Sequence, residues 1–269
     1  MVIIGQVSGK EALEEKFEIP FLEDQVFQGN YYTDRHENAW ILTYRKHFEF
    51  AHYHYGMVPF WSKSAVYHYE SPVEGTLNPG IERTKKRIIL HPSYRKPIRE
   101  NRCLVPVDYF LLLSESGDPY LVFSSVTDTF ALAGIFDHWK EDYYDKEYYK
   151  GFSILTVSAP EDFRIQGISR IPLIIPERKY KLWLNPEVAL AEITSLMENT
   201  TDHELNAYPI SKKLFLQKAN EKEICRPRGE MLRQLPQDPG KLASFLRSFR
   251  FKRGTTHKHP FQEERTWRS

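Results

Sequence analysis

The chain has 269 residues, with 37 basic Lys and Arg side chains against 36 acidic Asp and Glu side chains, a formal net charge of +1. A hydrophobic content of 41% and an aromatic content of 14% are those of a globular protein and exclude wholesale disorder. No run of about 18 apolar residues occurs, and the start of the chain lacks a basic segment followed by an apolar one, so we expect neither a membrane span nor a signal peptide. Two cysteines, Cys103 and Cys225, are too few for a disulfide scaffold, and we expect a reduced, cytoplasmic protein.

The small net charge hides two cationic segments. Residues 81–102 and residues 241–269 each carry eight basic and two acidic side chains, a local balance of +6. Residues 1–50 carry five basic and nine acidic side chains, a balance of −4. Clustered positive charge attracts a polyanion such as nucleic acid. The alternative is that both cationic segments are only solvated surface.

In chain order, the patterns predict a mixture of strands and helices. The predicted elements are a helix over 9–18, a strand over 39–44, a helix over 93–99, strands over 104–107, 111–113, 120–123, 129–135 and 152–158, helices over 160–165, 177–184 and 187–197, and an extended segment over 203–215. Strands and helices in this irregular order indicate an α+β fold. We predict a single domain with a curved, barrel-like, mainly antiparallel β core and peripheral helices.

The character of the sequence changes near its C-terminal end. After Arg226 the chain becomes polar, basic and interrupted by prolines. We therefore predict one domain over residues 1–225 and a basic extension over residues 226–269. This extension is expected to be partly helical, over 241–251, or disordered.

Familiar catalytic and metal-binding motifs are missing from the sequence. No phosphate-binding glycine loop, G-x-S-x-G or H-E-x-x-H occurs. His52 and His54 alternate along one segment but lack a third ligand, so we expect no metal and no cofactor. Cys103 lies at the start of an apolar strand, where a buried thiol is more typical than a reactive one. A thiol-dependent hydrolase that uses Cys103 is the remaining alternative of this kind.

Seven segments resemble, in order, the motifs of one family. They are residues 55–63, 77–82, 93–108, 130–139, 152–159, 170–175 and 180–184. They are similar to W-G-L-[IV]-P-x-W, N-A-R-x-E, S-F-R…R-C-L-[IV]-P-x-D, F-A-[FL]-A-G-L-[WY]-x-x-W, F-[ST]-I-[IL]-T-x-x-A, H-x-R-M-P-[VL]-I-L and a following Y-x-x-W-L of the SRAP family (SOS-response-associated peptidases, the abasic-site processing proteins). The resemblance covers about residues 30–215 and implies the SRAP fold.

The resemblance also implies a chemistry. Family members bind single-stranded DNA in a basic groove and recognise an abasic site, whose deoxyribose opens to an aldehyde. Their nucleophile is a Cys at position two, exposed when Met1 is removed, and its amine and thiol close on the aldehyde as a thiazolidine. An Asn and an Arg hold the sugar and phosphate, while a Glu and a His transfer protons.

The departures from the family pattern fall on these chemical positions. The family Asn and the motif Glu are matched by Asn78 and Glu82, but Val2, Gly80, Leu112 and Ile168 replace the Cys, Arg, Glu and His. We therefore expect binding to single-stranded DNA at abasic lesions with weak or absent covalent crosslinking, because most residues for the lyase or peptidase activity of the family are missing. The alternative is a catalytically inactive SRAP-fold module that recruits a protein or another ligand. If Met1 is removed, the α-amine of Val2 can still form an imine with an aldehyde.

Candidate DNA contacts follow from the same motifs. They are Trp61, Asn78, Glu82, Arg95, Arg99, Arg102 and Arg170. Trp61 is expected to stack on an unpaired base or to lie in the core, and the arginines to contact phosphates or to form a solvated face. Asn78 either binds the sugar or phosphate or closes an Asn-Pro-Gly turn. The expected partner is single-stranded or abasic DNA, bound by a monomer.

Overall fold

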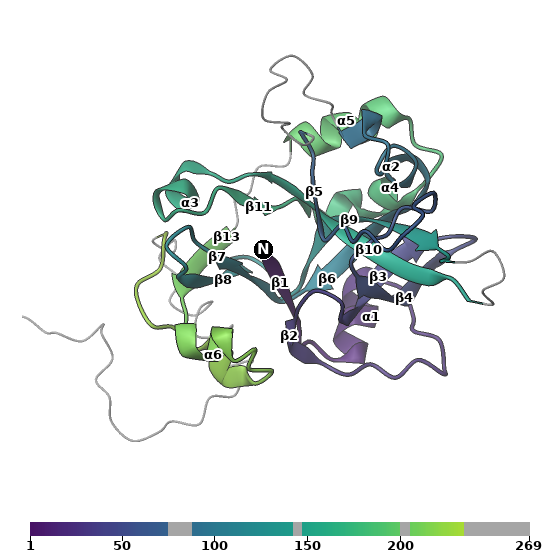
Figure 1. Cartoon of the computed structure of the whole chain (residues 1–269). Coiled ribbons are helices and arrows are strands. Elements are labelled where there is room, and N and C mark those ends of the chain that lie inside the picture. Colours follow the sequence, from purple (N-terminus) through teal and green to yellow (C-terminus); the bar gives the residue numbers. More distant parts are fainter. Residues whose placement is uncertain (75–87, 142–146, 200–204, 234–269) are drawn as a thin grey trace, which may run out of the picture.

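The computed structural model describes residues 1–74, 88–141, 147–199 and 205–233, and its strands form two sheets (Figure 1). The smaller, five-stranded sheet is antiparallel throughout. Its order is β13 (Leu205–Pro209), β8 (Pro119–Ser124), β7 (Tyr109–Leu113), β1 (Val2–Gln6) and β2 (Asn30–Thr33). The first residues of the chain therefore form an inner strand, which the sequence patterns did not predict.

The larger sheet has eight strands and is rolled into a barrel. Its order is β11 (Arg170–Pro172), β10 (Tyr149–Ser158), β4 (Phe48–Tyr55), β3 (Asn38–Tyr44), β6 (Arg102–Val107), β9 (Phe130–Trp139) and β12 (Ile174–Ile175), with β5 (Glu70–Pro72) paired to β10. Because β10 pairs with both β4 and β9, the strands β10, β4, β3, β6 and β9 close on themselves. Only the pairings of β10 with β4 and β5 are parallel among these strands. The predicted α+β fold with a barrel-like, mainly antiparallel core is confirmed.

Short helices cover the sheets. The described helices are α1 (Lys10–Phe17), η1 (Ile88–Leu90), α2 (Pro97–Glu100), α3 (Glu161–Ile165), η2 (Glu177–Lys179), α4 (Tyr180–Leu184), α5 (Leu190–Asn199), α6 (Lys212–Leu216) and η3 (Lys222–Cys225). None of these helices is long and apolar enough to cross a membrane. The extended segment predicted over 203–215 is wrong in its second half, because the Ser211 hydroxyl accepts a hydrogen bond from the Leu214 N–H and caps α6.

Strand alternation sorts the core into layers. On β3, Ile41 faces the cluster that fills the barrel interior, while its neighbour Leu42 faces a second cluster shared with α1, α2, α4 and α5. The interior cluster continues onto one face of the five-stranded sheet, and α6 and η3 cover the other face. The aromatic residues Phe136, Trp139 and Trp183 are buried in the core.

The domain boundary predicted at residues 225 and 226 is not tested by these observations and stays a prediction. Residues 226–233 lie along β13. Residues 234–269, which include the helix predicted over 241–251, lie outside the described part of the chain.

Gly151 should be essential to barrel closure. A Cβ atom at this position would lie 2.3 Å from the carbonyl oxygen of Gly56, which β10 approaches where it pairs with β4. We predict that Gly151→Ala lowers the free energy of unfolding by about 1–3 kcal/mol, because the backbones must separate. Chemical denaturation measures this loss. The exposed neighbour Lys150→Ala should change stability by less than about 0.5 kcal/mol, and equal effects of the two variants would contradict this account.

Candidate functional site

The start of the chain brings two sequence-predicted site positions together. Strand β1 pairs with β7 in a register that sets Val2 directly opposite Leu112. Both side chains are buried, at 2% and 3% exposure, and both belong to the interior cluster. Position two and the position of the family Glu are therefore cross-strand neighbours, about 4.5–5.5 Å apart at Cβ in such pairs.

A third predicted position reaches the same cluster from another element. Helix α3 ends before Gly167, whose φ of 75° turns the chain, and Ile168 then packs into the interior cluster beside the β1 and β7 residues. Ile168 is 2% exposed. The residues at positions 2, 112 and 168 thus form one apolar wall, whereas Asn78 and Glu82 lie outside the described residues.

Glu70 faces this wall from β5. Its Oε1 atom accepts the N–H of Val2 at 2.8 Å, and its Oε2 atom lies 3.6 Å from the Met1 ammonium. Arg35 approaches the same carboxylate, with Nη2 3.6 Å from Oε1. Glu70 is partly buried, with 24% of its side chain exposed, so its interaction with the N-terminus is screened less than that of a surface ion pair.

Aromatic side chains lie beside Val2 and Arg35 and, together with Glu70, form a polar wall. The Tyr55 hydroxyl donates to the Val2 carbonyl oxygen at 3.1 Å, and burial raises the pKa of Tyr55 well above its usual value. The ring of Tyr69 lies 4.6 Å from the Arg35 guanidinium, and its hydroxyl is 2.5 Å from Nε2 of His36. The arrangement therefore offers an amine, a carboxylate and a cation on one side and only apolar groups on the other.

Arg170 lies at the end of the segment that carries Ile168. Its guanidinium donates to the Glu74 carboxylate at 2.7 Å and to the Thr156 carbonyl oxygen at 2.5 Å. Burial raises the pKa of Glu74, but the hydrogen bond from Arg170, backbone hydrogen bonds and the charge of Arg170 together outweigh this, and the net pKa of Glu74 is lowered. Arg170 is half-buried, with 35% of its side chain exposed, so a phosphate could reach it only in competition with Glu74.

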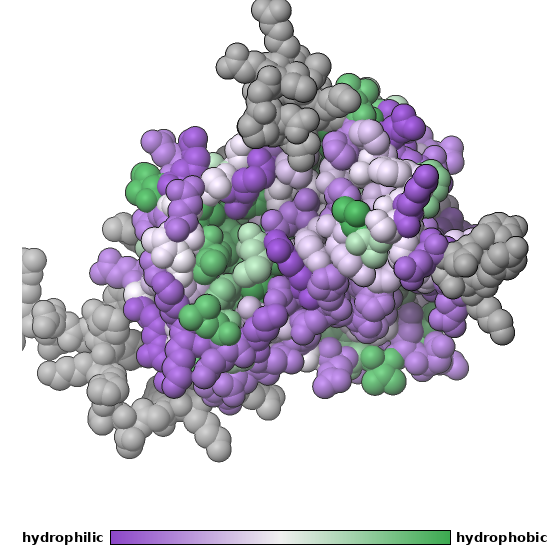
Figure 2. Space-filling view, viewed as in Figure 1, coloured by the Kyte–Doolittle hydropathy of each residue, from purple (hydrophilic) through white to green (hydrophobic). Residues whose placement is uncertain are grey.

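Figure 2 shows a hollow floored by hydrophobic residues near the N-terminus marked in Figure 1, with hydrophilic residues along its rim. We call the group formed by Val2, Glu70, Leu112 and Ile168 the N-terminal site.

The candidate DNA contacts differ in how far their side chains are exposed to solvent. Trp61 is 51% exposed, so it does not lie in the core, and its indole donates to the Pro92 carbonyl oxygen at 3.3 Å. Arg95 and Arg99 are exposed. Arg102 is 3% exposed, and its guanidinium donates to the carbonyl oxygens of Ile98, Arg99, Trp183 and Asn185. We therefore assign Arg102 to the core, where burial lowers its pKa to about 10, and remove it from the DNA contacts.

Both cysteines are buried, and the two histidines pack on aromatic rings. Burial raises the pKa of Cys103 well above its usual value and that of Cys225 to about 12, which disfavours the reactive thiolate at both residues. His52 packs on Trp40, with ring centroids 4.8 Å apart, and His54 stacks on Tyr149 at the same distance. Among the described residues, no group of three potential ligands could hold a metal ion.

Comparison with known proteins decides the family. The family described as SOS response associated peptidase (SRAP) matches residues 5–215 of the chain. The chain belongs to the SRAP family. Among relatives of this SRAP protein, the abasic site processing protein YoaM of Bacillus subtilis (strain 168) is 24% identical over 186 residues, which are 66% of this chain and 75% of the relative. The abasic site processing protein YoqW of the same organism is 25% identical over 175 residues, 63% of this chain and 73% of the relative.

Solved structures agree on the fold. A protein from Bacteroides thetaiotaomicron superimposes with a TM-score of 0.69 and 22% identity, covering 85% of this chain and 99% of the other. A protein from Bordetella bronchiseptica superimposes with a TM-score of 0.61 and 14% identity, covering 78% of this chain and all of the other. Both superpositions cover most of this SRAP chain and show that it has the same fold as these proteins.

Sequence reasoning missed Glu70 and Arg35. A signal for Glu70 was present, because Glu70 and Glu74 repeat the four-residue separation of Asn and Glu in N-A-R-x-E eight residues before Asn78 and Glu82. Arg35 had no comparable signal, since it lies outside every matched motif and reaches Glu70 only through the fold.

Arg102 should behave as a core residue. We predict that Arg102→Met lowers the free energy of unfolding by at least about 3 kcal/mol, because it leaves buried carbonyl oxygens without donors. The exposed Arg99→Met should cost less than about 1 kcal/mol. Chemical denaturation of both variants tests the assignment. A stable Arg102→Met protein with weakened DNA binding would instead return Arg102 to the DNA contacts.

Proposed function

We propose that this SRAP protein binds single-stranded DNA at abasic sites, with the lesion in the N-terminal site. The observation that carries the proposal is the convergence of positions 2, 112 and 168, the family's chemical positions, beside an N-terminal amine. The names of the curated relatives support the substrate class. An opened abasic sugar presents an aldehyde, and a primary amine is the group that reacts with it.

The strand of DNA would be held by exposed cations and an aromatic ring. Arg95 and Arg99 supply positive charge, and Lys96 lies 4.3 Å from the ring of the half-exposed Phe60. The neighbouring Trp61 offers a face on which a base can stack, an interaction of about 1–3 kcal/mol. Arg170 adds a phosphate contact when it exchanges Glu74 for the DNA.

The family thiazolidine cannot form at Val2, which has no thiol. We propose that an imine forms instead, with Glu70 as the acid–base group. Glu70 takes a proton from the N-terminal ammonium, the amine attacks the aldehyde carbon, and the resulting hydroxyl leaves as water with a proton returned by Glu70. Aldehyde and amine thus give imine and water, reversibly. The distances of 2.8 Å and 3.6 Å from Glu70 to the Val2 and Met1 nitrogen atoms serve either residue as the N-terminus.

This proposal implies another alignment of the N-A-R-x-E motif. If Glu70–Glu74 occupies the motif in space, the family Asn is replaced by Glu70 and the motif Glu is kept as Glu74. The hydrogen bonds from Val2 to Glu70 and from Arg170 to Glu74 support this register.

Removing two of the proposed phosphate contacts should weaken DNA binding. We predict that Arg95→Gln with Arg170→Gln reduces affinity for abasic single-stranded DNA about tenfold at low salt. The slope of log affinity against log salt should fall by about 1.4, since each phosphate contact to a single strand contributes about 0.7. Fluorescence anisotropy measures both quantities.

The matched control neutralises two exposed cations elsewhere, Arg178→Gln with Lys213→Gln. Their removal should leave the salt slope unchanged. A wild-type protein that does not bind abasic single-stranded DNA even at low salt would refute the DNA proposal. It would favour a module that recruits a protein through exposed side chains such as Phe60, Trp61 and Val66.

Borohydride should trap the imine. We predict a covalent product of the wild-type protein with abasic single-stranded DNA only when borohydride is present, because no thiol closes the ring. Glu70→Gln should form this product at least about tenfold more slowly, since it removes the proton transfers. The exposed Glu221→Gln is the control. Mass spectrometry of the trapped peptide should place the DNA on the N-terminal residue, and an adduct on a lysine would contradict the mechanism.

A further inference from the structure

The chain continues past the family-matched region and runs along an edge of the five-stranded sheet. We call residues 226–233 the C-terminal strap. The Arg228 N–H donates to the Pro209 carbonyl oxygen and the Leu232 N–H to the Ala207 carbonyl oxygen, both at 2.8 Å. These two bonds hold the strap against β13, the edge strand of the sheet.

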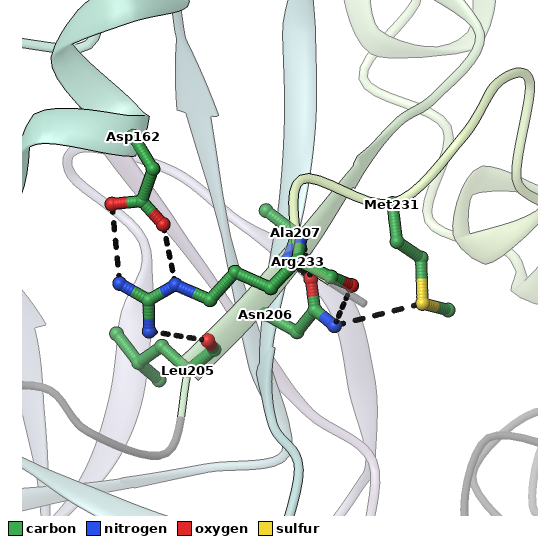
Figure 3. Close-up of polar contacts among 6 residues, drawn as sticks. All are labelled: Asp162, Leu205, Asn206, Ala207, Met231 and Arg233. Atoms are coloured by element: carbon green, nitrogen blue, oxygen red, sulfur yellow. Dashed lines mark hydrogen bonds and ion pairs between the residues drawn. The ribbon is translucent and has the colours of Figure 1, made fainter. Parts of the chain in front are cut away.

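The strap ends at Arg233, whose backbone and side chain both bind the rest of the domain (Figure 3). The Asn206 amide nitrogen donates to the Arg233 carbonyl oxygen at 2.9 Å, and its oxygen accepts the Arg233 N–H at 3.1 Å. The Arg233 guanidinium donates to both carboxylate oxygens of Asp162 and, at 2.9 Å, to the Leu205 carbonyl oxygen. Its central carbon lies 5.5 Å from the centre of the Phe163 ring. Arg233 therefore joins β13 to the first turn of α3.

Helix α3 has few means of its own to hold its position. It has five residues, and Pro160, the residue before it, provides no side-chain hydrogen bond to its first turn. Helices shorter than about 12 residues are marginally stable by themselves, so α3 depends on its tertiary contacts. The hydrogen bonds from Arg233 are the largest cause of a lowered pKa at Asp162, and the charge of Arg233 and backbone hydrogen bonds act in the same direction, against burial. The ion pair that anchors α3 therefore stays charged at neutral pH.

The turn after α3 carries one residue of the apolar wall, Ile168. The Phe163 carbonyl oxygen accepts the N–H groups of Gln166 and Ile168, both at 3.0 Å, so this turn is built directly on α3. Phe163 and Ile168 both lie in the interior cluster with Val2 and Leu112. An aliphatic side chain makes no directional bonds, so the position of Ile168 follows that of the backbone that carries it. The anchor of α3 is therefore also an anchor of the wall.

We propose that Arg233 is a positioning residue for the N-terminal site: it holds Ile168 against Val2 and Leu112, and the closed apolar wall keeps water from the imine. The inference rests on the proposed function. Formation of the imine releases water, and water returns the imine to amine and aldehyde, so its lifetime depends on how well the wall excludes water. If α3 shifts, the wall opens and hydrolysis becomes faster, whereas the exposed cations proposed to hold the DNA stay in place.

Two alanine variants of the strap separate this role from a loss of charge. Arg233→Ala removes the contacts with α3, and Arg228→Ala removes the same charge from an exposed side chain of the strap. A labelled single strand with one abasic site forms the imine, excess unlabelled abasic strand is added, and borohydride traps the remaining imine at successive times. Arg233→Ala should lose the trappable product at least about fivefold faster than wild type, because its wall is displaced. Arg228→Ala should lose it at the wild-type rate.

Further measurements distinguish positioning from general destabilisation. Affinity for a strand with tetrahydrofuran in place of the abasic sugar, which has no aldehyde, should stay within about twofold of wild type in Arg233→Ala. Hydrogen exchange of the free protein should become faster at the amides of Gln166 and Ile168 in Arg233→Ala and stay unchanged in Arg228→Ala. Arg233→Lys keeps the charge without the planar fork, so it should give an intermediate lifetime of the imine. This milder variant also serves as the test if Arg233→Ala does not fold.

The outcomes separate this inference from the function on which it rests. A wild-type protein that gives no borohydride-trapped product refutes the proposed function and this inference with it. If wild type is trapped and Arg233→Ala keeps the wild-type lifetime, only the positioning role is refuted, and faster exchange at Ile168 would then show a purely structural role for Arg233. Equal losses in Arg233→Ala and Arg228→Ala would assign the effect to charge and would also overturn the inference.

Discussion

The pairing of β1 with β7 fixes the position of the N-terminus and, with it, the whole site. Strand β1 is held between β7 and β2, so its register is set from both sides. In this register Val2 faces the interior cluster, while Ile3 faces the layer under α6 and η3. A slip of one residue would exchange these faces and bury the wrong side chains. The amine that meets Glu70 is therefore positioned by ordinary sheet packing.

The replacements at positions 2, 112 and 168 are all apolar and are compatible with one another. Val2, Leu112 and Ile168 pack in one buried cluster, where a lone carboxylate or imidazole would lose its hydration. The apolar wall is internally consistent, and the ionisable groups gather on the opposite side. Glu70 and Arg35 come from β5 and the turn after β2, elements that approach the N-terminus only in the folded chain.

Positive charge in this chain serves two different purposes. The cationic segment over 81–102 includes Arg99, which stays at the surface, and Arg102, whose guanidinium satisfies carbonyl groups inside the protein. At the other end of the described chain, the Arg233 guanidinium binds the Asp162 carboxylate in the first turn of α3. Net charge alone cannot distinguish these uses, because a buried guanidinium and an exposed one count equally.

The family, the α+β class and most central elements could be predicted from the amino-acid sequence, because motif spacing and short apolar runs are local properties. The strand over 39–44 and the helix over 9–18 were predicted to within one residue at each end. The β1 strand escaped prediction because its stability comes from pairing partners on both sides, which no local pattern records.

The positions that share a site, in contrast, are set by the folded chain. Val2, Glu70, Leu112 and Ile168 are far apart in the sequence and meet through strand pairing and a turn at Gly167. The same holds for the exposure of Trp61 and the burial of Arg102, since burial depends on neighbours from distant elements.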